Sequence, residues 1–390
     1  MQDMEKLMNT DALEIKPQDI FEFNAKALQT PGVINMTVGE PNFATPDHIK
    51  QAAIDCIKNR PIHYTVPQGI PEMLAAEANF LKKKYDVDYD PKSEIVSSVG
   101  VTEGVYTTFK AILNPGDEVL IPTPSFTIYG PNAILNGAKP IYMDTSKNDF
   151  KIDPKELDQI LASHPKIKAI IFNYPTNPTG VTYDYDELKA FADVFKKYPI
   201  FVISDEIYSE LSYSHKHICF AKLLPDQTIL LNGVSKSHAM TGWRVGFICA
   251  PKKIAQHILH VHELVTTSIP TVSQVAADEA LKNGMDDTKP MAEQYIQRRD
   301  ALYDGLTKIG FKVVKPQGAF YIFAKIPANL EQNDLKFAED LIAKEKLSIL
   351  PGRFFGAGGE GHLRISYAAS MDNIHETIKR LTDYIQNYSK

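Results

Sequence analysis

A lysine at position 236 lies in a stretch whose residue types are suited to amine chemistry. Residues 233–246 read GVSKSHAMTGWRVG, and they follow the apolar run 228–231, which predicts a buried strand. A lysine at the end of a core strand is partly desolvated, which lowers its pKa and frees its amine as a nucleophile. Ser235 and Arg244 in the same stretch are suited to binding a phosphate. Most lysines are solvated surface residues, so the interpretation of Lys236 depends on the rest of the chain.

Two further segments supply groups that a Schiff-base lysine needs to work with pyridoxal 5'-phosphate (PLP). The GVTEG stretch from Gly100 ends a predicted strand and opens a helix, where exposed N–H groups attract a phosphate. Asp205 ends another apolar strand, and a protonated pyridine nitrogen would compensate for burial of its carboxylate. Tyr208, three residues further on, is within reach of the ring hydroxyl. The alternatives are an ordinary strand–glycine–helix junction and an aspartate that caps the next helix.

Three more residues have the right chemistry for the ring or the substrate. The turn NYPTNPTG (173–180) is rigid, and the amide of Asn177 can donate to the ring oxygen. We predict a cis Asn177–Pro178 bond in this tight turn. Phe126 follows a strand exit and could stack on the ring, or simply belong to the core. Arg364, in HLRISYAAS, could grip an amino-acid carboxylate in bidentate fashion, or form a structural salt bridge.

Length and composition narrow the class of protein. The chain has 390 residues, 44% of them hydrophobic and 23% charged, which is typical of a globular protein with a sizeable core. The net charge of −6 gives no support for nucleic-acid binding. Three separated cysteines argue against a disulfide scaffold or a metal site and favour a reducing cytoplasm. Without a signal-peptide core or a membrane-length apolar run, we expect a cytoplasmic protein with no membrane partner.

Short apolar runs alternate with helical patterns through the middle of the chain. Helices are predicted at 103–113 and 185–197, among others. The strand candidates are 94–100, 118–124, 139–144, 169–175, 200–206, 228–235 and 245–250. This alternation predicts a doubly wound α/β domain with a seven-stranded, mostly parallel sheet, whose ligands bind beyond the carboxyl ends of the strands.

The pattern changes near residue 286 and predicts a smaller α+β domain. Its expected elements are a helix at 291–309, strands at 311–314 and 319–324, a helix at 334–344, a strand at 362–367 and a helix at 371–388. We therefore predict a large domain at 47–285. Residues 1–46 and 286–390 are predicted to form the small domain with an N-terminal arm.

Together these segments resemble the class-I aminotransferases of the fold-type-I PLP superfamily. The likeness runs over nearly the whole chain and also includes VGEP at 38–41 and the pair Tyr64 and Gly69. It implies that Lys236 forms the Schiff base and moves the substrate proton, and that Asp205 pairs with the pyridine nitrogen. The remaining cofactor contacts that it implies are Tyr208 and Asn177 on the ring oxygen, Phe126 on the ring face, and Val101, Thr102, Ser235 and Arg244 on the phosphate.

The resemblance also implies a homodimer with shared active sites. Tyr64 would reach the phosphate of the neighbouring subunit, and Arg364, with Asn177 and the Gly39 backbone, would hold the substrate carboxylate. One residue departs from the pattern: Gly233 stands where many relatives carry a phosphate-binding serine. We expect the phosphate to lose a hydroxyl contact and Ser235 to matter more.

Within the family, the likeness is to a bacterial branch of aromatic amino-acid and N-acetyl-diaminopimelate aminotransferases. It is carried by LNGVSKSHAMTGWRVGF, DEIYSEL and GEGHLRISYAASMD, and the stretches 283–300 and 323–338 look most like the aromatic type. The implied reaction is ping-pong transfer from an aromatic L-amino acid to 2-oxoglutarate. An N-acetyl-L,L-diaminopimelate or aspartate-type aminotransferase, or a PLP β-lyase using the same lysine and aspartate, is the alternative. A regulator on this fold would normally carry a fused DNA-binding domain, which the charge does not support.

Overall fold

A seven-stranded sheet forms the centre of the molecule. The computed structural model describes residues 4–15 and 19–388. Residues 1–3, 16–18 and 389–390, which fall within the predicted arm and small domain, lie outside the described residues. The strand order is β2-β8-β7-β6-β5-β3-β4, and only β8 runs antiparallel to its neighbours. The strands are β2 (Ile95–Val99), β3 (Glu118–Thr123), β4 (Lys139–Asp144), β5 (Ile167–Asn173), β6 (Phe201–Asp205), β7 (Thr228–Gly233) and β8 (Val245–Cys249).

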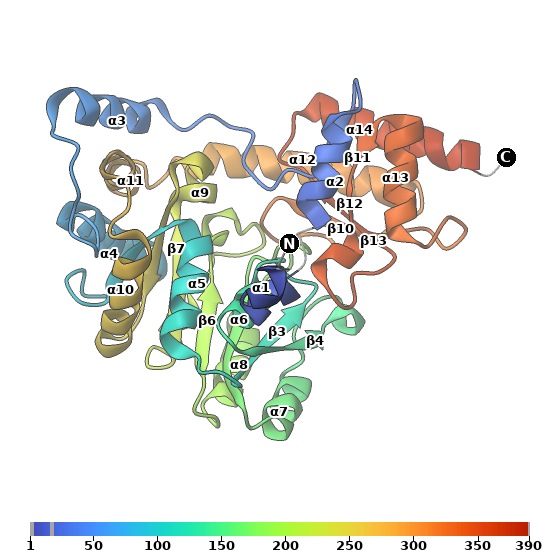
Figure 1. Ribbon diagram of the computed structural model, residues 1–390. Coiled ribbons are helices and arrows are strands. Elements are labelled where there is room, and N and C mark those ends of the chain that lie inside the picture. Colours follow the sequence, from blue (N-terminus) through green and yellow to red (C-terminus); the bar gives the residue numbers. More distant parts are fainter. Residues whose placement is uncertain (1–3, 16–18, 389–390) are drawn as a thin grey trace.

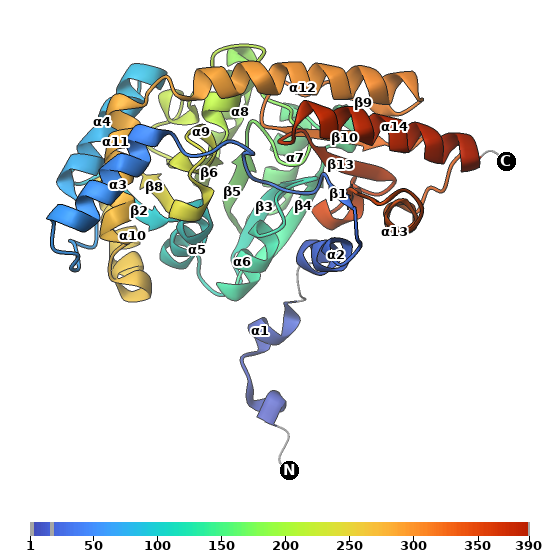
Figure 2. The same ribbon diagram turned by 90° about the horizontal axis from the view of Figure 1, so that it is seen from above.

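Helices cover both faces of this sheet, so its central strands are buried throughout. In β7, Ile229 and Leu231 face one hydrophobic cluster while Leu230 faces another, as the two-residue period of a strand requires. Figure 2 shows α5 and α6 on one side of the sheet and α7 and α8 on the other. The helices of this region are α3 (Asp47–Asn59), α4 (Pro71–Tyr85), α5 (Gly100–Ile112), α6 (Tyr129–Leu135), α7 (Pro154–Ser163), α8 (Tyr185–Phe195), α10 (Lys252–Thr266) and α11 (Thr271–Asn283). The predicted doubly wound α/β architecture is confirmed.

A second, four-stranded antiparallel sheet follows the long helix α12 (Thr288–Lys308), at the upper right of Figure 1. Its strand order is β12-β13-β10-β9. The strands are β9 (Lys312–Val313), β10 (Tyr321–Lys325), β12 (Leu350–Pro351) and β13 (His362–Ser366). The helices α13 (Asp334–Glu345) and α14 (Met371–Tyr388) flank it. The smaller α+β unit predicted from the sequence is therefore present.

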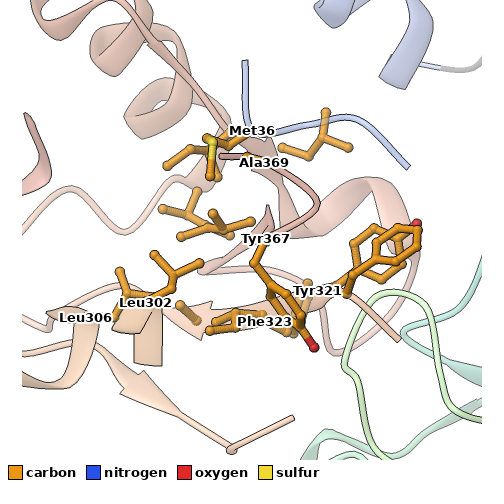
Figure 3. Packing of buried hydrophobic residues seen from close by; sticks show 14 of the residues in the cluster. Met36, Leu302, Leu306, Tyr321, Phe323, Tyr367 and Ala369 are labelled. Atoms are coloured by element: carbon orange, nitrogen blue, oxygen red, sulfur yellow. The ribbon is translucent and has the colours of Figure 1, made fainter. Parts of the chain in front are cut away.

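The N-terminal segment packs on this smaller sheet. Its helix α2 (Asp19–Leu28) lies beside α13, where Lys26 pairs with Glu339, and the two-residue strand β1 (Ile34–Asn35) pairs with β11 (Leu347–Ser348). Met36 is buried in the same cluster as Leu302, Phe323 and Tyr367, as Figure 3 shows. The described part of the chain before α2 includes the short helix α1 (Thr10–Glu14), which is drawn apart from the two sheets in Figure 2. These contacts support our proposal that 47–285 form one domain and 1–46 with 286–390 the other.

Several predicted boundaries are wrong by two or three residues. The predicted strand 319–324 begins only at Tyr321, because Ala319 has a left-handed φ of 55°. The predicted helix 103–113 begins earlier, at Gly100, directly after β2. The strands β1, β11 and β12 were not predicted, because two residues are too few to show a period.

Candidate active site

A cavity of about 560 Å³ lies at the carboxyl ends of β5, β6 and β7, where open α/β sheets bind their ligands. Its wall also includes the start of α5, residues of α2 and the small sheet. The predicted site residues that line it are Gly39, Val101, Thr102, Phe126, Asn177, Asp205, Tyr208, Ser235, Lys236, Arg244 and Arg364. The fold therefore gathers at one place residues that are more than 300 positions apart at the extremes, Gly39 and Arg364.

Lys236 reaches the cavity from α9 (Val234–Ser237), one turn of helix after β7. The predicted strand 228–235 is two residues too long, because pairing with β8 ends at Gly233. Lys236 Nζ donates a hydrogen bond to the Gly39 carbonyl at 2.6 Å. Burial lowers the pKa of Lys236 to about 8, with Arg244 and Arg364 acting in the same direction against Glu40. A substantial fraction of this amine is therefore neutral near physiological pH.

Asp205 is the last residue of β6, and its carboxylate is buried. Its Oδ2 accepts a hydrogen bond from Tyr129 Oη at 2.6 Å, and its Oδ1 accepts one from the Ile207 N–H at 3.2 Å. Burial raises the pKa of Asp205 to about 6, although the Tyr129 bond opposes that rise. Asp205 does not cap a helix, since the next element, η3 (Ser209–Leu211), has Tyr208 at its N-cap. A cationic partner such as a pyridinium would offset the cost of this buried charge.

The start of α5 and Arg244 form an anion cradle. Val99, at the N-cap of this 13-residue helix, makes no side-chain capping bond, so N–H groups of the first turn remain for a ligand. Arg244 donates to the Thr241 carbonyl at 3.0 Å (Nη1) and to the Val99 carbonyl at 3.3 Å (Nη2). A Cβ built on Gly100 would lie 2.4 Å from Arg244 Nη2, so only glycine allows the guanidinium to approach. The size and charge of this cradle suit a phosphate.

Arg364 extends from β13 and is buried. Its Nη1 donates to Asn177 Oδ1 at 3.0 Å and its Nη2 to the Thr37 carbonyl, whereas its Nε has no hydrogen-bond partner. Among the described residues it forms no ion pair, so the structural salt bridge considered from the sequence is absent there. A buried guanidinium without a carboxylate suits a ligand that brings one.

The family model for "Aminotransferase class I and II" matches residues 31–385 of this sequence. The chain belongs to the class I and II aminotransferases. Over 98% of its length it is 43% identical to the "Probable N-acetyl-LL-diaminopimelate aminotransferase" of Bacillus subtilis, covering 96% of that protein. It is 37% identical to an aspartate aminotransferase of Pyrococcus horikoshii, with 95% of each chain covered.

Solved structures agree with this membership. The aromatic aminotransferase of Pyrococcus horikoshii OT3 superposes with a TM-score of 0.88 at 35% identity, covering 94% of this chain and 99% of that one. The Thermus thermophilus aspartate aminotransferase with maleate gives a TM-score of 0.91 at 33% identity, covering 96% and 99%. The fold is that of the fold-type-I PLP enzymes, and this aminotransferase is PLP-dependent. The site fits that cofactor, because it holds a depressed-pKa lysine, a buried carboxylate and an anion cradle.

Two sequence-based expectations need comment. Tyr64 is 88% exposed and does not line the cavity of its own chain, so its predicted contact depends on a second subunit. The expected loss of a hydroxyl contact to the phosphate at Gly233 stays a prediction. A Cβ there would lie 2.8 Å from the Val245 carbonyl oxygen, so a serine at this position would require β8 to shift.

Sequence reasoning missed three residues of the aminotransferase site. Tyr129 binds Asp205, the Thr37 carbonyl binds Arg364, and the Tyr321 hydroxyl lies 2.9 Å from that of Tyr208. Tyr129 follows Phe126 by one helical turn, which was a usable signal. Thr37 and Tyr321 lie in short segments with no local pattern. The predicted cis Asn177–Pro178 bond is confirmed.

None of the helices in the described part of the chain is long and apolar enough to cross a membrane. Within residues 4–15 and 19–388, no three His, Cys, Asp or Glu side chains gather in a way that would hold a metal ion. The three cysteines are buried and free.

Proposed function

We propose that this aminotransferase moves the amino group of an aromatic L-amino acid to 2-oxoglutarate by a ping-pong mechanism. The observation that carries the substrate preference is the make-up of the cavity wall. Its cationic side chains are Lys236, Arg244 and Arg364, and each has another task in the proposal. No further cation of the described residues faces the cavity to select a second carboxylate.

The rest of the wall supports an aromatic side chain. The apolar residues that α2 and the segments before α3 and α6 contribute are Ile20, Leu28, Val38, Phe126 and Ile128. An aromatic ring would bury its surface against them. Asn24 and Thr37 lie on the same wall, and their neutral polar groups can accommodate the distal carboxylate of 2-oxoglutarate by hydrogen bonding.

In this proposal Lys236 and Asp205 carry the chemistry. The bound cofactor supplies a ring that accepts the electrons of the substrate Cα–H bond. Lys236 Nζ, neutral in part because of its lowered pKa, takes the Cα proton and returns it. The Asp205 carboxylate keeps the pyridine nitrogen protonated, and Tyr129 holds that carboxylate in place.

The other proposed roles concern binding. Val101, Thr102, Ser235 and Arg244 hold the phosphate. Tyr208 and Asn177 contact the ring oxygen, and Phe126 lies on the ring face. Arg364, helped by Asn177 and the Gly39 backbone, holds the carboxylate of each substrate in turn, which is what a ping-pong cycle with one site requires.

We propose a homodimer in which Tyr64 completes the partner's phosphate site. Large apolar side chains of the same segment are exposed beside it, namely those of Ile62 and Val66. Such a patch is typical of a protein interface. Sedimentation velocity should give twice the monomer mass, and a monomer that retains full activity would contradict the proposal. The predicted cytoplasmic location stays a prediction.

The second candidate substrate is N-acetyl-L,L-diaminopimelate, favoured by the 43% identity to the Bacillus subtilis relative.

The test is kcat/KM for L-phenylalanine, L-tyrosine, L-aspartate and N-acetyl-L,L-diaminopimelate with 2-oxoglutarate as acceptor. We expect the aromatic pair to exceed the others by at least about tenfold, the factor that corresponds to 1.4 kcal/mol of transition-state binding. The reverse order would move the substrate to the second candidate. Release of pyruvate and ammonia from a sulfur amino acid without an acceptor would indicate a β-lyase.

A further inference from the structure

Two buried tyrosines meet where the two sheets face each other. Tyr208 lies just after β6 of the seven-stranded sheet, and Tyr321 begins β10 of the four-stranded sheet. Their hydroxyl oxygens are 2.9 Å apart, although the residues are 113 positions apart in the chain. Both line the cavity, and their rings meet edge to face at 5.9 Å between centroids. Tyr321 therefore joins the small sheet to a proposed ligand of the cofactor.

If Tyr208 contacts the ring oxygen of the cofactor, only one of the two phenols can be the donor in the hydrogen bond between them. Each phenol has one proton. Among the described residues, each of the two hydroxyls has the other as its hydrogen-bond partner. If Tyr208 donates to the ring oxygen, its own oxygen must accept, and Tyr321 must donate. A donor on the Tyr208 oxygen polarises its O–H bond and strengthens its bond to an ionised ring oxygen.

The face of the same ring supports Arg364. Tyr321 pairs with Ser366 across β10 and β13, so Arg364 is its diagonal neighbour on the same face of the sheet. The Arg364 guanidinium carbon lies 4.4 Å from the centroid of the Tyr321 ring. Desolvated cation–π contacts of this kind stabilise the cation and fix the plane of the guanidinium group. The hydroxyl of Tyr321 thus contacts Tyr208 at the proposed cofactor end of the site, and its ring face contacts Arg364 at the proposed carboxylate end.

We propose that Tyr321 is a positioning residue that couples these two ends. Its hydroxyl orients Tyr208 toward the cofactor ring oxygen, and its face orients Arg364 toward the substrate carboxylate. The inference rests on the proposed roles of Tyr208 and Arg364. The close approach of Gly39 agrees with it, since a Cβ there would lie 3.0 Å from the Tyr321 hydroxyl. The ionisable groups that face the phenol pair are Arg364, Asp205 and Lys236.

The test compares four single variants and one double variant of the PLP-loaded enzyme. Tyr321→Phe removes the hydroxyl and keeps the ring, while Tyr321→Leu removes both. Tyr208→Phe tests the role on which the inference rests. Tyr367→Phe is the matched control, because its buried hydroxyl donates to the Ala319 carbonyl at 3.1 Å and does not line the cavity. The readouts are a pH titration of the cofactor's visible absorbance without substrate, and the KM for L-phenylalanine.

We expect Tyr321→Phe to raise the pKa of the visible absorbance by about 0.5 to 1, the worth of one hydrogen bond, with KM changed less than about twofold. Tyr321→Leu should also raise KM by roughly 5- to 30-fold through Arg364. Tyr321→Phe in the Tyr208→Phe background should add no further shift, and Tyr367→Phe should match wild type.

Three results separate the outcomes. If Tyr208→Phe alone leaves the titration unchanged, the proposed role of Tyr208 fails and this inference fails with it. If Tyr208→Phe shifts the titration but Tyr321→Phe does not, the coupling through Tyr321 is overturned while the proposed function stands. Equal KM values for Tyr321→Leu and Tyr321→Phe would remove the contribution to Arg364.

Discussion

The two ends of the active site are assembled in different ways. At the cofactor end, Asp205 ends β6 and Lys236 follows β7, its parallel neighbour, so backbone pairing alone brings them together. At the carboxylate end, Arg364 also depends on the Thr37 carbonyl and the Asn177 side chain, which come from segments outside its own sheet. Strand pairing fixes the first end, whereas hydrogen bonds between separate segments complete the second. We therefore expect changes at the cofactor end to affect the rate of chemistry and changes at the carboxylate end to affect binding.

The largest effect is expected at Lys236. Lys236→Ala removes the amine that we propose takes and returns the Cα proton, and such groups typically contribute about 10²- to 10⁴-fold. Turnover should fall by at least that factor, while the variant still binds PLP through the phosphate cradle. Steady-state kinetics together with equilibrium dialysis of PLP would measure both. Substantial multiple-turnover activity would refute the role of Lys236.

The second prediction concerns Asp205. Asp205→Asn removes the proposed partner of the pyridine nitrogen, and breaking a buried ion pair costs about 3–5 kcal/mol, so kcat should fall by roughly 150- to 5,000-fold with little change in KM. A fall confined to KM would contradict the division between the two ends.

Asp205 also predicts a pH dependence for the cofactor-free protein. Its folded pKa, about 6, is raised above the ordinary value of 3.8, so the stability it contributes is present below the unfolded pKa and is lost as pH rises through the folded pKa. Asp205→Asn should therefore raise the melting temperature of the cofactor-free protein more at pH 8 than at pH 4. Equal changes at both values would argue against the buried, unpaired carboxylate.

The third prediction tests the carboxylate end. Arg364→Lys keeps a positive charge but loses the planar fork, so KM for L-phenylalanine should rise by roughly 10- to 100-fold, the worth of charge-assisted hydrogen bonds. The limiting rate should fall much less. Steady-state kinetics with each substrate varied will show whether KM for 2-oxoglutarate rises in parallel, as one shared carboxylate site requires. A rise for one substrate alone would mean that the two bind differently.

The smallest effect is expected at Tyr129. Tyr129→Phe removes one hydrogen bond from Asp205 and should raise the pKa of that carboxyl further. We expect kcat/KM to fall by roughly 2- to 10-fold, the range for one net hydrogen bond. Tyr183→Phe is the matched control, because its buried hydroxyl contacts the Ile152 N–H outside the main cavity. Equal losses in both variants would indicate general destabilisation instead.

The same contrast explains what the sequence could predict. Asp205 and Lys236 were found because each follows an apolar run that announces a strand end. Arg364 was found through the alternating strand around it and the family resemblance. Tyr321 and the Thr37 carbonyl were missed, because their contacts depend on how the small sheet meets the large sheet and the N-terminal segment. The tight space beside Gly233 could not be predicted either, since it depends on the neighbouring strand β8.

We infer that the cofactor end of the active site governs chemistry and that the carboxylate end governs binding. The most direct test follows the cofactor's visible absorbance in a single half-reaction with L-phenylalanine, for wild type, Asp205→Asn and Arg364→Lys. We expect a lower limiting rate at an unchanged half-saturating concentration of L-phenylalanine for Asp205→Asn. For Arg364→Lys we expect a raised half-saturating concentration with nearly the wild-type limiting rate. The opposite pattern, or no absorbance change with any amino acid in the wild type, would contradict it.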